Sequence, residues 1–298
     1  MTILSNMVSS TWMSLEVDTT DVQAVRLRVA RDYWRLFPAG DQDFVGRVFS
    51  EVVDCFQGRH PEFQAIDARY HDLEHTLQGT LCFSTLLRRR AEAGARPVLR
   101  EETFQLGLLA ILLHDTGYLK RREDLEGTGA KYTATHVNRS CDFAERFLAA
   151  RGFTLRQIQA VQGMIRCTGL GVNIGALQFA GEEERIAGHA LGTADLLGQM
   201  AAADYPEKLP ILYLEFAESA AHNQGRGGSG GAAFASAEEL IRKTPGFWRH
   251  YVLPKVEQDF GGLHRFLVDP ATGRNQYLDL IEANLERLQR QLAAEAAA

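Results

Sequence analysis

The sequence predicts an all-α protein. Apolar residues recur at spacings of three and four along most of the chain, which is the pattern of amphipathic helices. No group of segments alternates apolar and polar residues as strands do, and there is no internal repeat. Turn signals rich in glycine and proline separate the helical segments. Together these features predict helices joined by turns, without a sheet.

Helical periodicity is clearest in two segments of the first half of the chain. Segment 44–56 reads FVGRVFSEVVDCF, and segment 103–115 reads TFQLGLLAILLHD. The same spacing of apolar residues continues in segments 140–152, 154–168, 185–201, 210–222 and 275–298. Turns are predicted at 58–61, 94–97, 127–129, 152, 169–175 and 206.

We expect one helical core with additions at both ends. Residues 1–20 are predicted to be irregular, and residues 21–222 to form the core. Glycines dominate residues 223–235, which predicts a flexible loop, either a plain surface linker or a mobile lid. Residues 236–298 are predicted to be a helical C-terminal extension packed on the core. Ser236, with Glu239 three residues later, is the expected N-cap of its first helix.

Length and composition are those of an ordinary globular chain. It has 298 residues, 45% hydrophobic and 23% charged, which is long enough to bury a sizeable core. The formal net charge of −6 offers no basic surface to a nucleic-acid backbone, so nucleic acid is not expected as the main partner. Whether chains associate into a homo-oligomer stays open.

Three features predict a cytoplasmic protein. The four cysteines are scattered, with no CxxC pair, which suggests free thiols in a reducing compartment. No stretch reaches the roughly 18 apolar residues that a membrane span needs, so no membrane partner is expected. The N-terminal residues lack the basic start of a signal peptide.

The stretch RYHDLEHTL places two histidines, His71 and His75, four residues apart. If residues 70–78 were helical, both side chains would lie on one face. The pair alone leaves three interpretations open: a metal site, part of an acid/base mechanism, or a solvated helix face.

Further ionisable residues stand in apolar surroundings. A strongly apolar helix ends on His114 and Asp115, where two polar groups are costly to bury unless they are paired or bind metal. His136 lies where a polar stretch leads into an amphipathic helix, and Asp195 is a lone carboxylate among small and apolar residues. Ligands of these types suit Mn, Fe, Zn or Ni, and Mg if waters complete the shell.

The order H…HD…H…D in a helical chain resembles the HD-domain superfamily of metal-dependent phosphohydrolases. LLAILLHDTGYLK resembles the HD signature of that superfamily, and LGTADLLGQM resembles its closing aspartate helix. YHDLEHTL is similar to the YHNxxHA segment of cyclic-nucleotide phosphodiesterases, which belong to the same superfamily. The resemblance covers roughly residues 65–200 and implies an HD-domain helical bundle.

The resemblance also implies roles for individual residues. One metal would be held by His75, His114, Asp115 and Asp195. Asp115, counted among the catalytic residues, would bridge to a second metal, which His136 would help to hold. His71 would protonate the leaving oxygen.

Other residues are candidates for supporting parts. Glu74 and Asp72 are candidates for orienting the His71 ring. Lys131 and Arg166 are candidates for binding phosphate oxygens.

The expected activity is hydrolysis of a small-molecule phosphoester or phosphodiester, with a nucleotide as the favoured substrate class. The sequence departs from the superfamily pattern where many two-metal members have a later histidine, because Arg166, Cys167 and Thr168 stand there. One or two metals are therefore expected. Two alternatives remain: a mixed-valent di-iron oxygenase of the HD type, and a non-catalytic nucleotide-binding module.

Overall fold

The computed structural model describes residues 17–224 and 233–297. Within these ranges the chain forms ten α-helices with short 3₁₀ and π-helical turns, and it forms no strand. Only two isolated β-bridges occur in the described part, Phe63 with Arg121 and Val268 with Asn275. The all-α prediction is confirmed. The expected irregular start and glycine-rich loop lie mostly outside the described residues.

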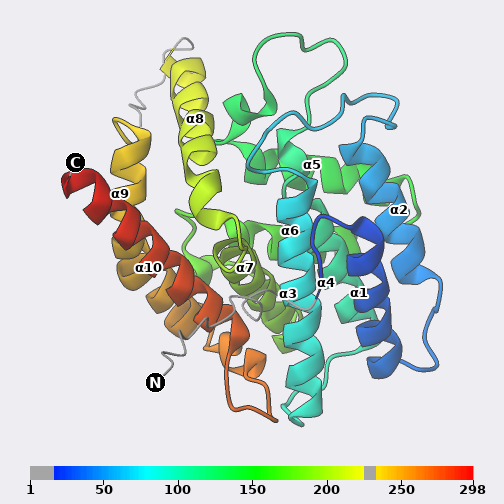
Figure 1. Cartoon of the computed structure of the whole chain (residues 1–298). Helices are drawn as coiled ribbons and strands as arrows, with labels where there is room; N and C mark the ends of the chain where they lie inside the picture. The colour runs from blue at the N-terminus through cyan, green and yellow to red at the C-terminus, as the bar shows by residue number, and fades with distance from the viewer. Residues whose placement is uncertain (1–16, 225–232, 298) are drawn as a thin grey trace, which may run out of the picture.

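Ten helices follow one another along the chain (Figure 1). The first five are α1 (Val22–Leu36), α2 (Phe44–Phe56), α3 (Leu73–Glu92), α4 (Glu101–Leu113) and α5 (His136–Ala149). The others are α6 (Leu155–Ile165), α7 (Glu182–Met200), α8 (Tyr205–Gln224), α9 (Ala237–Phe247) and α10 (Gln276–Ala297). Three short turns bear on the site: η1 (Thr116–Tyr118), η2 (Gly129–Tyr132) and η3 (Arg166–Thr168).

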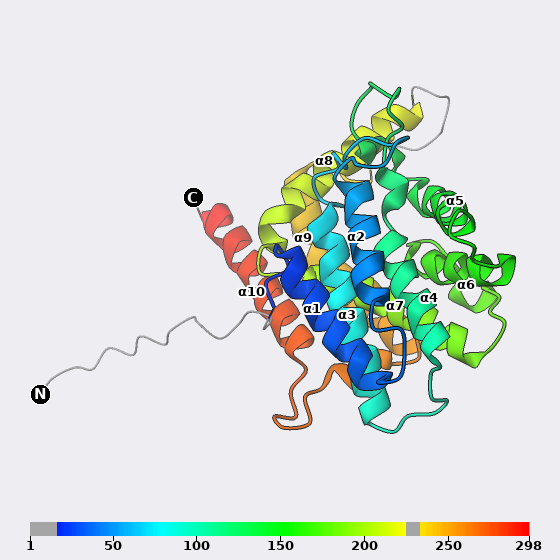
Figure 2. The same cartoon turned by 90° about the vertical axis from the view of Figure 1, so that its right-hand side faces the viewer.

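Helix α3 lies between α1 and α7 in the middle of the bundle, and α4 packs on both α3 and α7. Figure 2 shows α1, α2 and α3 running side by side. In Figure 1, α8, α9 and α10 form the left side of the molecule. None of the described helices is long and apolar enough to cross a membrane.

Two glycines let α3 and α7 approach closely. A Cβ atom on Gly198 of α7 would lie 2.8 Å from the backbone oxygen of Gln78 in α3. Gly79 of α3 in turn faces α7, because its Cβ would lie 3.7 Å from the Cα atom of Asp195. Real side chains essentially never come closer than 3.0 Å, so glycine is required at residue 198. This contact brings the His75 end of α3 to Asp195.

The start of α3 differs from the expected helix over 70–78. Asp72 is the N-cap of α3, and its carboxylate accepts a hydrogen bond from the His75 backbone N–H at 2.9 Å. His71 therefore precedes the helix, and the four-residue helical spacing does not describe its relation to His75. The two rings are still 5.3 Å apart, centroid to centroid.

The C-terminal helix α10 contacts the end of α7. The Asn284 side-chain amide donates hydrogen bonds to the carbonyls of Met200 and Ala202, at 2.9 and 2.7 Å. The last carbonyls of a helix lack partners within it, so these bonds satisfy the end of the helix that carries Asp195. Ser236 caps α9 as expected, accepting from the backbone N–H of Glu239.

Candidate metal centre

Four ionisable side chains meet where three helices converge. His75 comes from the first turn of α3, His114 and Asp115 follow α4, and Asp195 comes from α7. His75 Nε2 lies 3.2 Å from both Asp115 Oδ2 and Asp195 Oδ1. His114 Nε2 lies 3.3 and 3.4 Å from the same two oxygens. Two ring nitrogens thus face two carboxylate oxygens.

These groups are buried and incompletely hydrogen-bonded. All four residues are less than a tenth exposed, and His114 Nε2 and Asp115 Oδ2 have no hydrogen-bond partner within the described ranges. His114 Nδ1 lies 2.7 Å from the Ile111 carbonyl, to which it can only donate, so in the neutral ring Nε2 carries the lone pair that a metal would need. An unsatisfied buried nitrogen and oxygen in one small space suit a cation. His75, His114 and Asp195 could hold a metal ion, since each offers one ligand atom and these atoms lie within 4.8 Å of one another.

The electrostatics of the cluster favour opposite charges. Burial alone would lower the pKa of His75, but hydrogen bonds and attraction from Asp115 and Asp195 raise it to about 9. The pKa of His114 is raised well above its usual value by the same carboxylates, against the effect of burial. Burial works to raise the pKa of Asp115 and Asp195, but the two histidines hold both well below the usual range. When no cation is bound, the two carboxylates therefore favour the protonated form of both histidines.

His136 approaches the cluster from the start of α5. Its Nε2 lies 3.9 Å from Asp115 Oδ1, the carboxylate oxygen that points away from His75 and His114. Its Nδ1 lies 2.7 Å from the Thr133 carbonyl, which leaves the Nε2 lone pair free. Burial lowers the pKa of His136, so its ring is neutral at pH 7. Gly117 permits this approach, because a Cβ there would lie 2.0 Å from the His136 carbonyl oxygen.

His71 lies beside the cluster and is held by a different carboxylate than expected. Its Nδ1 is 2.6 Å from Glu215 Oε2, and Glu215 Oε1 accepts the Tyr70 backbone N–H at 2.7 Å. Burial works to raise the pKa of Glu215, but His71 and these hydrogen bonds lower it.

The two carboxylates considered for this role are engaged elsewhere. Glu74 pairs with Lys208 at 2.9 Å, and Asp72 caps α3. Glu215 was not expected from the sequence. Its one signal is a lone carboxylate between Leu214 and Phe216, the same type of signal that marks Asp195.

Tyr118 of η1 joins His71 to His136. Its ring stacks on His71 at 4.5 Å with an interplanar angle of 11°, and on His136 at 4.8 Å and 23°. It is fully buried, and its hydroxyl has no hydrogen-bond partner in the described residues. The His71 and His136 rings are themselves 6.0 Å apart, so the three rings form one compact cluster beside Asp115.

The structure places the two phosphate-binding candidates apart from these side chains. Lys131 is buried, and its Nζ binds the Asp124 carboxylate and the Glu126 carbonyl, each at 2.5 Å. It lines a separate cavity of about 370 Å³. Arg166 begins η3 and lies near Cys141.

The position that lacks the expected histidine is turned away from the cluster. Cys167 is buried, and its Sγ would lie 3.1 Å from a Cβ on Gly188, about two turns before Asp195 in α7. Its thiol has a weak contact with the Gly163 carbonyl at 3.8 Å. Burial raises the pKa of this thiol to about 12, so it stays protonated at neutral pH.

Comparison with known proteins finds a similar fold but no similar sequence. No protein-family model matches this chain, and no curated protein matches it in sequence. The fold is similar to that of the phosphodiesterase domain of the RhoPDE fusion protein from the choanoflagellate Salpingoeca rosetta. The match covers 98% of each chain with a TM-score of 0.60, at 15% sequence identity. At this identity the likeness concerns the fold.

Proposed function

We propose that this protein is a metal-dependent phosphohydrolase of the HD-domain superfamily that hydrolyses a small-molecule phosphoester or phosphodiester, with a nucleotide as the favoured class. The observation that carries the proposal is the buried convergence of His75, His114, Asp115 and Asp195, with a ring nitrogen and a carboxylate oxygen unsatisfied. The fold likeness to a phosphodiesterase domain supports it. Phosphoester hydrolysis therefore explains both the site and the fold.

The donor set fits a divalent metal. Two imidazole nitrogens and two carboxylates are the ligands that Mn, Fe, Zn and Ni accept, and Mg accepts the carboxylates with water. When bound, the metal would supply a water of lowered pKa and positive charge for the phosphoryl oxygens. His75, His114, Asp115 and Asp195 would hold it. Their burial keeps bulk water from competing for these ligand atoms.

Asp115 is placed to serve two sides of the site. Its Oδ2 faces His75 and His114, while its Oδ1 faces His136. His136 is neutral at pH 7 with its Nε2 lone pair directed at that side, as a ligand must be. We therefore assign Asp115 as the bridge to a second metal position, which His136 would help to hold.

His71 is assigned as the proton donor to the leaving oxygen. The Glu215 carboxylate accepts from Nδ1, which leaves Nε2 to carry the transferable proton. The same carboxylate stabilises the imidazolium form, and the parallel Tyr118 ring fixes the plane of the imidazole. Glu215 and Tyr118 act as positioning residues for this step.

The oxygenase alternative has less support. A di-iron centre of the HD type normally needs six protein ligands, and the residues at 166–168 supply none to this cluster, because Cys167 packs against α7 at Gly188. Oxygen uptake with an iron signal in electron paramagnetic resonance would reverse this ranking. Tight nucleotide binding without hydrolysis of any phosphoester would instead support a non-catalytic module.

The test combines metal analysis with substitution. The purified protein is assayed against phosphomonoesters and phosphodiesters with Mn, Mg, Fe and Zn. His75→Ala and Asp195→Ala should lose metal and activity together. His71→Ala should keep its metal while turnover falls roughly 10²- to 10⁴-fold, the usual contribution of general acid catalysis. Arg156→Gln, on the exposed face of α6, serves as the control. Loss of metal in His71→Ala would contradict the assigned roles.

A further inference from the structure

A charged cavity lies next to the candidate metal centre and shares η1 and α5 with it. It has a volume of about 370 Å³, at the lower end of small-molecule pockets. Thr116 of η1 forms part of its wall, while Tyr118 of the same turn stacks on His71 and His136. Helix α5 likewise sends His136 to the metal centre and Arg139 and Arg146 to this cavity. The cavity contains none of the candidate metal ligands.

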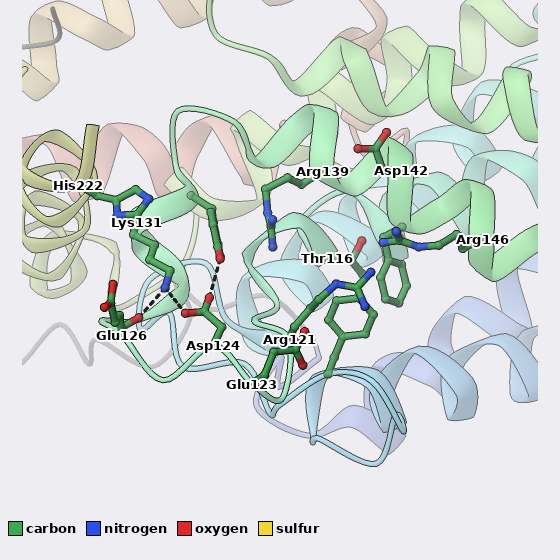
Figure 3. Close-up of a pocket in the computed structure, with 13 residues that line it drawn as sticks. Thr116, Arg121, Glu123, Asp124, Glu126, Lys131, Arg139, Asp142, Arg146 and His222 are labelled. Atoms are coloured by element: carbon green, nitrogen blue, oxygen red, sulfur yellow. Dashed lines mark hydrogen bonds and ion pairs between the residues drawn. The ribbon is translucent and has the colours of Figure 1, made fainter. Parts of the chain in front are cut away.

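Three guanidinium groups point toward the same space in this cavity. Figure 3 shows Arg121, Arg139 and Arg146 converging around Thr116. Burial lowers the pKa of Arg139, Tyr132 and Asp124 raise it, and the positive charges of Arg121 and Arg146 lower it, so both of these guanidinium groups lie close enough to Arg139 to act on it. Like charges brought together in a concave site favour an anion between them.

Part of the donor capacity of these arginines is unused. The Arg146 side chain makes no hydrogen bond or ion pair within residues 17–224 and 233–297. Arg121 uses one terminal nitrogen, which pairs with Glu62 at 2.9 Å. Arg139 donates from Nε and one terminal nitrogen to the Gly117 and Leu119 carbonyls, at 2.7 and 2.8 Å. Each side chain retains at least one N–H group for a ligand.

Four acidic residues line the same cavity, but none of them forms an ion pair with Arg121, Arg139 or Arg146 in the described residues. Asp124 is bound by Lys131 Nζ and by the Tyr132 hydroxyl, both at 2.5 Å. Glu123, Glu126 and Asp142 are exposed, so water screens their charges. Arg121 and Arg146 are exposed and Arg139 is half-buried, so a ligand from solution can reach the three guanidinium groups.

We propose that this cavity is a second binding site, which takes a phosphate group between Arg121, Arg139 and Arg146. Guanidinium groups match the oxygen geometry of phosphate and form charge-assisted hydrogen bonds with it. Inorganic phosphate or the phosphate of a small molecule could supply the group, and the volume accommodates either. The site is separate from the proposed hydrolysis and does not depend on it.

The proposal is tested by binding of inorganic phosphate to the full chain, measured by calorimetry at constant ionic strength. Arg121→Gln and Arg146→Gln should each weaken binding about tenfold, because a charge-assisted hydrogen bond is lost. Arg146→Lys should keep most of the affinity, since it retains the positive charge. Arg156→Gln, an exposed arginine of α6 outside the cavity, should bind like the wild type.

Asp195→Asn separates this site from the metal centre. It should still bind phosphate, whereas loss of binding in this variant would place the anion at the metal centre and overturn the proposal. Unchanged affinity in both Gln variants, or no saturable binding by the wild type, would overturn it too. Adenosine monophosphate, measured in the Asp195→Asn background, identifies the source. Tighter binding than inorganic phosphate points to a phosphorylated small molecule, and equal binding points to phosphate itself.

Discussion

His71 is held by a carboxylate 144 residues further along the chain. Because Glu215 accepts from His71 Nδ1 at 2.6 Å, it both orients the ring and stabilises its positive charge. Neither residue belongs to the group of His75, His114 and Asp195 that could hold a metal ion. The proposed proton-transfer pair and the candidate metal ligands are therefore separable by mutation.

Glu215→Gln should slow turnover by roughly 10- to 100-fold, a part of the 10²–10⁴ that general acid catalysis supplies. The amide keeps a hydrogen-bond acceptor but loses the negative charge beside the His71 ring, so the loss should appear in kcat. Metal content should not change. Glu207→Gln, an exposed residue of the same helix that pairs with Arg287, is the matched control. An unaltered kcat would remove Glu215 from the mechanism.

Metal binding should release protons. The pKa of His75 is raised to about 9 by Asp115 and Asp195, so its ring is protonated at pH 7 in the metal-free protein. A ligand histidine must be neutral, and the pKa of His114 is also raised well above its usual value, so affinity should rise at least about tenfold per pH unit from pH 7 until the pH reaches about 9. Calorimetry in two buffers of different ionisation enthalpy measures the protons released. A metal affinity that is flat over this range would show that His75 is not a ligand.

At the scale of helices, the metal centre depends on how closely α3 and α7 pack. Gly198→Ala would place a Cβ 2.8 Å from the Gln78 carbonyl oxygen, and because backbone cannot yield cheaply, α7 must move away from α3. We expect a loss of about 1–3 kcal/mol of unfolding free energy. Metal affinity should fall as well, because Asp195 moves with α7.

Gly246→Ala is the control for this substitution. Gly246 lies in α9, where an added Cβ meets nothing within 4 Å, so alanine should be neutral or stabilise by up to about 1 kcal/mol. Urea denaturation and metal titration of both variants provide the comparison. Equal stability and metal affinity in Gly198→Ala would mean that the α3–α7 distance does not position the site.

Local sequence patterns predicted which segments are helical better than they predicted which distant side chains pair. Helix α2 coincides with the predicted segment 44–56, since its apolar spacing is uninterrupted. Helix α1 was not predicted, although Asp21 caps it and Val25, Val29 and Tyr33 form its buried face. Charged residues between these positions obscure the pattern.

In the candidate site, too, single residues could be predicted from the sequence but the distant partner of His71 could not. The sequence predicted His114, Asp115 and Asp195 as site residues. Each is an ionisable residue next to small or apolar residues, where a buried charge needs a partner. The partner of His71 could not be predicted, since a single glutamate in a helix carries no spacing signal. The choice among Glu215, Glu74 and Asp72 is made by how α8 packs near the start of α3. Tertiary contact, which local pattern does not encode, decides it.

At the scale of the whole molecule, the candidate ligands connect helices that are distant in sequence. His75 follows the start of α3, Asp195 lies in α7, and α10 supports the end of α7 through Asn284. Ion pairs between His75 and the two aspartates join these helices at the site, in addition to their packing. A cation bound by all four residues would therefore stabilise the packing of α3, α4 and α7 together.

Chelation should consequently lower the thermal stability of the entire chain. A ligand present at 100 times its Kd adds about 2.7 kcal/mol to the unfolding free energy when it binds only the folded state. For a chain of this length the loss on chelation corresponds to roughly 5 °C in Tm. Asp195→Asn should show no shift between chelator and added metal, because one of its ligand oxygens is replaced by an amide. A wild-type Tm that ignores chelation, in protein shown to contain metal, would mean that the ion binds outside this site.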